Sequence, residues 1–147
     1  MDDHQIRMMQ LGAKGYVCSQ ILVKMMLELR GEENPLLVRA MAGPGYGCAT
    51  GSATCGALVG GCCALSLYVA KGSDAETPSE RLPLMLTALS EWFAGQIGSR
   101  HGGITCDEIV GEGGPLKSQQ TCAGIVADTY VKINAILAEN GIDPTVT

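Results

Sequence analysis

Cysteines are the residues of this sequence best suited to carry chemistry. The chain of 147 residues contains seven of them, and an odd number of thiols cannot all pair within one chain. The cysteine thiolate is a soft ligand for iron, zinc and copper, and it is also the nucleophile of thiol–disulfide exchange. Metal binding or redox chemistry is therefore favoured over a framework of structural disulfides. The seven positions are Cys18, Cys48, Cys55, Cys62, Cys63, Cys106 and Cys122.

Three of these cysteines stand where a helix is expected to begin. Cys55 follows a glycine-rich loop, Cys106 follows Thr105, and Cys122 opens the last predicted helix. A thiol at a helix N-terminus lies near unpaired N–H groups and the positive end of the helix dipole, so the thiolate is favoured there. Cys18 is expected inside a helix instead. If the helices converge, the four sulfurs meet at one site.

The other three cysteines receive different predictions. Cys48 lies in the glycine-rich loop and can reach the same site, so it ranks fifth as a metal ligand. Cys62 and Cys63 lie in an apolar helix and are expected in the core. Cys55 and Cys62 are two helical turns apart, about 10.5 Å along the axis, so they cannot bind one single ion. His101 is expected to be a surface residue.

Composition excludes several classes of partner. The net charge is −5, and the basic residues are scattered singly, so neither nucleic acid nor an anionic membrane surface is an expected partner. The longest apolar stretch, residues 57–70, is too short to span a bilayer, and the N-terminal residues lack the layout of a secretory signal. We expect a cytoplasmic protein.

The elements that must position the cysteines are predicted to be helices of an all-α fold. Leu, Ile, Val, Ala and Met supply the core, and only 4% of residues are aromatic, which suits helix packing. We expect one domain over residues 1–147, a compact bundle of about four to six helices. Small residues fill one of them, so another backbone must pack against it, as in a central helix or a homodimer contact. The predicted helices are 4–29, with its stronger part at 14–29, then 35–41, 53–69 capped by Ser52 or Thr54, 80–98, 106–110 and 119–140, with a loop of unusual backbone geometry at 43–52.

The cysteine pattern resembles the C_GCAxxG_C_C family of redox-active proteins over nearly the whole chain. Cys18 follows Gly-Tyr-Val, Cys55 opens the box Cys-Gly-Ala-Leu-Val-Gly, and Cys106 lies within Gly-Ile-Thr-Cys-Asp-Glu. Cys122 takes the fourth position, and Trp92 with its neighbour Phe93 fits an aromatic position before the third cysteine.

This resemblance implies a redox role. A similar module occurs in split-Soret cytochromes, where an iron–sulfur cluster accompanies haem, so the resemblance implies electron transfer through a [2Fe–2S] or [4Fe–4S] cluster and an unidentified redox protein as partner. Haem is not expected, because the sequence has no Cys-x-x-Cys-His motif. The implied ligands are Cys18, Cys55, Cys106 and Cys122; Cys48 departs from the family pattern and is the candidate substitute because of its place in the glycine-rich loop.

Two alternatives stay open. A thiol–disulfide protein would use Cys55 as its catalytic nucleophile, although the chain lacks a Cys-x-x-Cys pair. A cysteine-rich zinc or copper protein would use the same four thiolates for a single metal ion. Whether the chain is an enzyme is left open.

Overall fold

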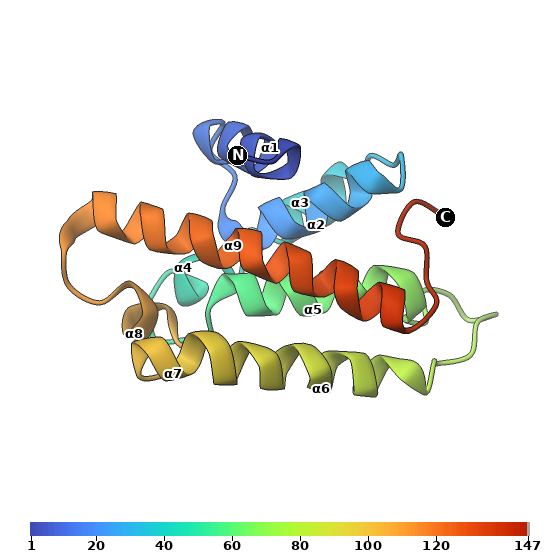
Figure 1. Cartoon of the computed structure of the whole chain (residues 1–147). Coiled ribbons are helices and arrows are strands. Elements are labelled where there is room, and N and C mark those ends of the chain that lie inside the picture. Colours follow the sequence, from blue (N-terminus) through green and yellow to red (C-terminus); the bar gives the residue numbers. More distant parts are fainter. Residues whose placement is uncertain (147) are drawn as a thin grey trace.

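A computed structural model describes residues 1–146, apart from the side chains of residues 115 and 116. Five helices of eleven or more residues make up most of this described chain, and its only strand-like pairing is one isolated bridge (Figure 1). The predicted all-α bundle is confirmed. The elements are α1 (Asp3–Ala13), α2 (Cys18–Leu29), α3 (Pro35–Ala40), α4 (Gly45–Cys48), α5 (Gly56–Val69), α6 (Arg81–Phe93), the π-helical turn η1 (Ala94–Gly98), α7 (Ser99–His101), α8 (Cys106–Val110) and α9 (Gly114–Glu139).

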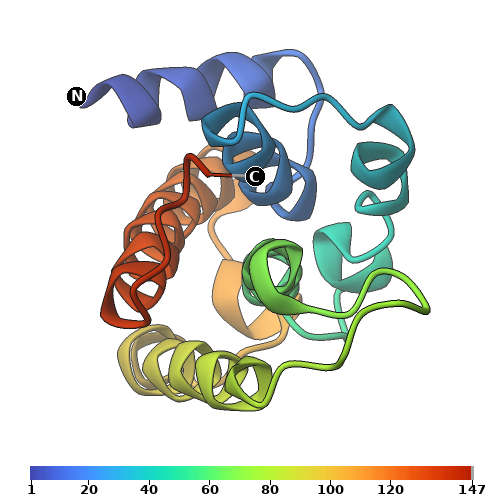
Figure 2. The same ribbon diagram turned by 90° about the vertical axis from the view of Figure 1, so that its right-hand side faces the viewer.

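Helix α5 is the centre of the bundle. It contacts α2, α6 and α9, and Figure 2 shows it end-on with these helices around it. A Cβ atom on Gly60 would lie 2.7 Å from the Cα atom of Ser19 in α2, and one on Gly61 would lie 2.9 Å from Leu89 in α6. The small residues therefore let neighbouring helices of the same chain approach closely, as predicted for a central helix. A homodimer stays a prediction.

Buried polar groups in the core are hydrogen-bonded. Ser19 is fully buried in α2 and donates its hydroxyl hydrogen to the carbonyl oxygen of Met41 at 2.6 Å. Thr129 is fully buried in α9 and donates to the carbonyl oxygen of Ile125 at 2.7 Å. The Ser19 bond ties α2 to the end of α3, and thereby fixes where the following glycine-rich segment starts.

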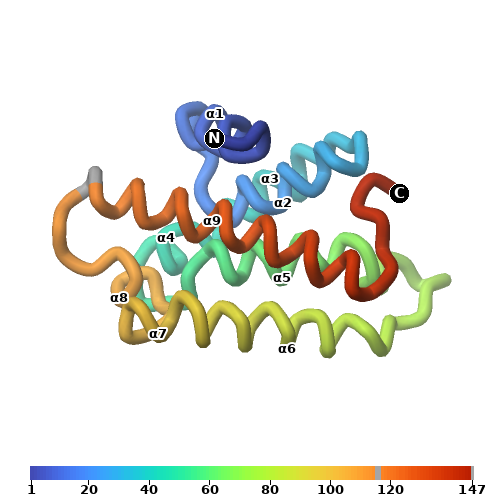
Figure 3. Tube along the Cα trace, in the orientation of Figure 1, coloured from blue at the N-terminus to red at the C-terminus, as the bar shows by residue number. Residues whose placement is uncertain are grey.

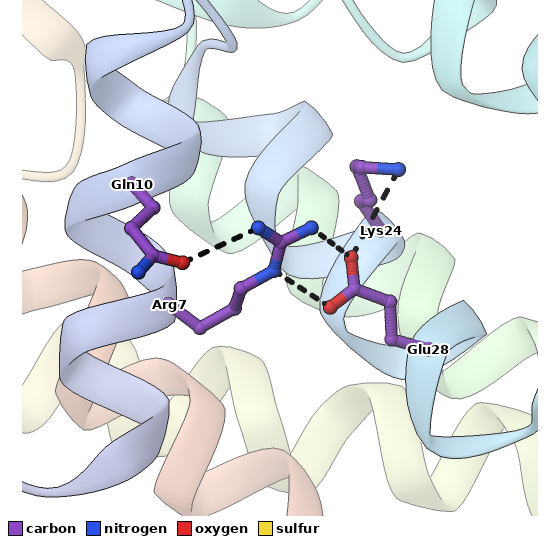
Figure 4. Close-up of polar contacts among 4 residues, drawn as sticks. All are labelled: Arg7, Gln10, Lys24 and Glu28. Carbon is purple, nitrogen blue, oxygen red and sulfur yellow. Dashed lines mark hydrogen bonds and ion pairs between the residues drawn. The ribbon is translucent and has the colours of Figure 1, made fainter.

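Helix α1 is oriented against α2 by a cluster of charged side chains. Arg7 donates from Nε to Glu28 at 2.9 Å and from Nη2 at 2.8 Å, while Lys24 lies 3.9 Å from Glu28 (Figure 4). Gln10 accepts a longer hydrogen bond, 3.4 Å, from Arg7. The hydrogen bond and the positive charge of Arg7 lower the pKa of Glu28. Because these groups are exposed, they orient α1 more than they stabilise it.

Several predicted helix boundaries are corrected by the structure. The interruption expected near Gly15 divides the segment 4–29 into two helices, with Gly15 at a left-handed φ of +97°, and the second helix begins at Cys18 and not at residue 14. Helix α5 begins at Gly56 with Cys55 at its N-cap, because Thr54 pairs with Thr105 instead of capping. The helix predicted at 80–98 consists of α6 and η1 and continues into α7 to His101, and the last helix begins five residues before the expected start. In the described chain, no helix is both long and apolar enough to cross a bilayer.

Candidate functional site

Two of the predicted ligands, Cys55 and Cys106, are brought together by backbone pairing. Thr54 and Thr105 form an antiparallel bridge, in which Cys55 faces Ile104 and Cys106 faces Ala53 across the pairing. The Cys55 N–H donates to the carbonyl oxygen of Ile104 at 2.8 Å, and the Cys106 N–H donates to that of Ala53 at 3.1 Å. Helices α5 and α8 therefore both begin at one short antiparallel backbone pairing.

Cys18 reaches the same place because the N-terminus of α2 packs against that of α5. A Cβ atom on Gly56 would lie only 2.6 Å from the Sγ atom of Cys18. Any side chain at position 56 would displace this sulfur. The glycine after Cys55 thus gives the Cys18 sulfur its place, which is a physical reason for a Cys-Gly pair at this point.

The four thiols of Cys18, Cys55, Cys106 and Cys122 interact with one another. The pKa of three of them is raised by other members of the group: Cys55 and Cys122 act on Cys18, Cys106 acts on Cys55, and Cys55 and Cys106 act on Cys122. Figure 3 shows α4, α8 and the first half of α9 at the same end of the molecule. Separate elements, α2, α5, α8 and α9, contribute one cysteine each.

The helix positions of Cys18 and Cys122 are the reverse of those predicted. Cys18 is the first residue of α2, after Val17 in extended conformation, and so it occupies a helix N-terminus. Cys122 lies in the third turn of α9, because the helix begins directly after Gly113. Two sequence signals indicate that a helix begins at Cys18. Gly15 ends the preceding helix, and the Gln20 side chain accepts from the N–H of Val17 at 3.1 Å at the start of α2.

The prediction that helix N-termini favour the thiolate is wrong for this site. Burial raises the pKa of Cys18 to about 12 and that of Cys122 to about 11, and neighbouring cysteines add to both shifts. Burial also raises the pKa of Cys55 and of Cys106. Removal from water disfavours the charged form more strongly than the helix ends favour it. The metal-free site therefore holds neutral thiols at pH 7.

Backbone N–H groups nevertheless act against burial at two of the thiols. Those of Ser19 and Tyr46 lie near the Cys18 sulfur, and those of Ala57 and Leu58 lie near Cys55; each lowers the pKa of its cysteine. Sequence analysis did not identify these donors, although the glycine content of residues 43–52 did predict unusual backbone geometry there. Such donors stabilise a thiolate and tune the potential of a thiolate-bound centre.

Helix α4 is the unusual segment that supplies one of these donors. Tyr46, Gly47, Cys48 and Ala49 have φ values of 55°, 60°, 55° and 68°, a run of four left-handed residues. Three of them carry side chains, which makes this conformation unfavourable by roughly 1–2 kcal/mol per residue. The surrounding structure must hold the turn in place. The prediction of an irregular loop is confirmed.

The remaining cysteines and His101 lie in other settings. Cys48 is exposed at the end of α4. Cys62 and Cys63 are half-buried in the second half of α5, and no charge coupling links either of them to the four-thiol group. His101, at the end of α7, is half-buried, so the prediction of a surface residue holds only in part.

Thiolate sulfur is a donor for single metal ions and for iron–sulfur clusters alike. Among the residues that the structure describes, no three His, Cys, Asp or Glu side chains are grouped to hold one metal ion. A single tetrahedral zinc at about 2.3 Å from each thiolate needs sulfurs only about 3.8 Å apart. A polynuclear cluster binds its cysteines on separate irons and so accepts a wider set of sulfurs. Four converging thiols with N–H donors match that requirement.

Comparison with known proteins gives one match. A family model described as "Putative redox-active protein (C_GCAxxG_C_C)" covers residues 16–136, which include all seven cysteines. No curated protein and no solved structure matches the chain.

Proposed function

The chain belongs to the C_GCAxxG_C_C family, and from that premise we propose that it is an electron-transfer protein carrying an iron–sulfur cluster on Cys18, Cys55, Cys106 and Cys122. The observation that carries the proposal is the convergence of these four thiols from four separate elements. Buried cysteines in a packed core have no reason to interact as one group. A shared ligand gives them that reason.

The chain's own residues prepare the site for anionic sulfur. Bound there, the cluster would supply a reversible one-electron couple. The N–H groups near Cys18 and Cys55 stabilise thiolate charge, and the close packing of Gly56 keeps the Cys18 sulfur in position. The neutral thiols of the metal-free site must release protons when they bind metal, so loading becomes easier as pH rises.

The two alternatives have less support. A thiol–disulfide enzyme that used Cys55 would need an accessible thiolate, but Cys55 is 8% exposed and burial raises its pKa. A zinc or copper protein would need its sulfurs grouped around one ion, which the described residues do not provide. An electron-transfer role also requires a second redox protein as partner, and we propose one without specifying its class.

The proposal is tested by anaerobic purification followed by iron, zinc, copper and acid-labile sulfide analysis with a visible spectrum. We expect iron with matching sulfide in the wild type and a severalfold loss of both in Cys122→Ser. The matched control is Cys63→Ser, which changes another half-buried cysteine in a helix and should keep its iron. Zinc or copper without sulfide would contradict the cluster and support a thiolate site for one of these metals. No metal after reconstitution with iron and sulfide would refute the proposal.

A further inference from the structure

The exposed thiol of Cys48 lies beside the cysteine group but outside it. It is the only exposed thiol in the described part of the chain, whereas Cys55 is buried and the other five are half-buried. A disulfide reagent can approach Cys48 directly from solvent, and access is one of the factors that control thiol–disulfide exchange. A disulfide also requires a second thiol within reach of Cys48.

Cys106 is the neighbour that the backbone brings closest to the Cys48 turn. A Cβ atom on Gly47 would lie 2.9 Å from the Cβ atom of Cys106, and α4 contacts α8. Cys48 is one Cα step, about 3.8 Å, beyond Gly47. A disulfide needs Cα atoms about 4.4–6.8 Å apart, so a local shift of the turn is enough to bring the pair together.

The segment that must shift is the left-handed turn itself. Tyr46, Cys48 and Ala49 hold positive φ values although each carries a side chain. Any rearrangement that returns these residues to ordinary backbone geometry relieves an unfavourable conformation. The carbonyl oxygen of Tyr46 accepts from the Gly51 N–H at 3.0 Å, and that of Gly45 accepts from the Ala49 N–H at 3.0 Å, so these hydrogen bonds of the turn stay within residues 45–51.

We propose that Cys48 and Cys106 form a reversible intramolecular disulfide by exchange with a low-molecular-weight disulfide. The Cys48 thiolate attacks one sulfur of the reagent, which forms a mixed disulfide and releases one thiol. The Cys106 thiolate then attacks the Cys48 sulfur and releases the second thiol. Two protein thiols are oxidised, one reagent disulfide is reduced to two thiols, and the two cysteine protons pass to the released thiolates.

The consequence of this disulfide rests on the proposed function. A Cys106 sulfur bound to Cys48 is no longer free as a cluster ligand, so oxidation removes one of the four ligands. The pair then acts as a redox-sensitive control on the cluster site. The disulfide chemistry itself can be tested on metal-free protein, which separates the two proposals.

The first experiment treats reduced, metal-free protein with glutathione disulfide at pH 8.5 and maps the products by mass spectrometry. We expect the chain to lose the mass of two hydrogens and to yield a peptide in which Cys48 is linked to Cys106. Cys48→Ser should not form the link, and Cys62→Ser should form it as the wild type does. A lasting glutathione adduct on Cys48, or linkage of Cys48 to another cysteine, would overturn the proposal.

The second experiment applies the same reagent anaerobically to iron-loaded protein. We expect the wild type to lose iron at least severalfold faster than Cys48→Ser, which changes only an exposed side chain. Equal rates would overturn the control role of the pair. A wild type that forms the link but never binds iron would support the disulfide and refute the cluster instead.

Discussion

The two halves of helix α5 carry cysteines of the same kind in different settings. At its N-terminus, the charge of Cys55 raises the pKa of Cys18, and nearby backbone N–H groups lower the pKa of both thiols. Two turns later, Cys63 and the hydroxyl of Ser90 affect the pKa of Cys62, and none of the thiols of the four-thiol group does. Burial raises the pKa of the thiol in both halves. Convergence of separate elements, and not burial or cysteine number, therefore distinguishes the candidate site.

The largest expected effect comes from breaking the junction between the two halves. Gly60 lies against the backbone of Ser19, and a Cβ atom there would lie 2.7 Å from a Cα atom and 2.9 Å from a carbonyl oxygen. Backbone atoms cannot move aside as a side chain can. We expect Gly60→Ala to lower the free energy of unfolding by about 1–3 kcal/mol in urea denaturation, despite the better helix propensity of alanine.

Gly124→Ala is the matched control for this prediction. Gly124 is an exposed residue within α9, and a Cβ atom there would meet nothing within 4 Å. We expect this substitution to raise the free energy of unfolding by up to about 1 kcal/mol from helix propensity alone. Equal stabilisation by both substitutions would mean that α2 and α5 are not in close contact.

A second prediction perturbs only the cysteine group at the N-terminus of α5, through a substitution in the neighbouring α4. Gly47 has a φ of +60°, and a Cβ atom there would lie 2.9 Å from both the Ala53 carbonyl oxygen and the Cys106 Cβ atom. Gly47→Ala keeps all seven cysteines but should displace Cys106. We expect a loss of roughly 1–2 kcal/mol in unfolding free energy and a severalfold lower iron content after anaerobic reconstitution.

Gly31→Ala separates the backbone cost from the effect on the site. Gly31 has a similar φ of +68° at the end of α2, and a Cβ atom there would meet nothing within 4 Å. Its unfolding free energy should fall by a similar amount while its iron content stays at the wild-type value. If both variants lose iron alike, the effect of Gly47→Ala is general destabilisation and not displacement of Cys106.

Sequence periodicity and local signals were enough to predict the helices and several of their ends. Asn34 accepts from the N–H of Leu37 at 3.1 Å at the start of α3, and Thr105 caps α8 by accepting from the N–H of Glu108 at 3.2 Å. Gly141, with a φ of +69°, follows the end of α9. These ends depend on side chains a few residues apart, so the sequence contains the information needed to predict them.

The positions that sequence alone did not predict depend on contacts between distant segments. Cys55 became an N-cap because Thr54 pairs with Thr105, some fifty residues away in the chain. The raised pKa of Cys18 arises from burial among helices that no local pattern specifies. The positive end of a helix dipole favours the thiolate locally, but burial in the folded protein raises the pKa by more.

A third prediction uses pH to compare the two groups of thiols. The ordinary pKa of a cysteine is 9.0, whereas that of Cys18 is raised to about 12 in the folded protein. Between these values the unfolded chain has released the proton and the native chain still holds it, so the free energy of unfolding falls as pH rises from 9 to 12. Reduced, metal-free protein should show this slope in urea denaturation.

Cys18→Ala should flatten that slope more than Cys63→Ala does. Both variants remove one thiol, but Cys18 is affected by the charges of Cys55 and Cys122 in addition to burial, whereas burial alone acts on Cys63. Tyrosine and lysine titrate in the same range and contribute equally to all three proteins. Identical slopes in the two variants would show that the four-thiol group does not differ from the second half of α5 in its proton affinity.

The smallest expected effect concerns the second half of α5 alone. The Ser90 hydroxyl lowers the pKa of Cys62, which burial raises. Ser90→Ala should therefore slow alkylation of Cys62 by about two- to threefold, at the lower end of what one hydrogen bond contributes, without changing iron content. Ser66→Ala is the control, because that hydroxyl donates to the Cys62 carbonyl oxygen at 2.8 Å and not to the sulfur. Equal alkylation rates in the two variants, measured by isotope-labelled peptide mapping, would show that Cys62 is held by packing alone.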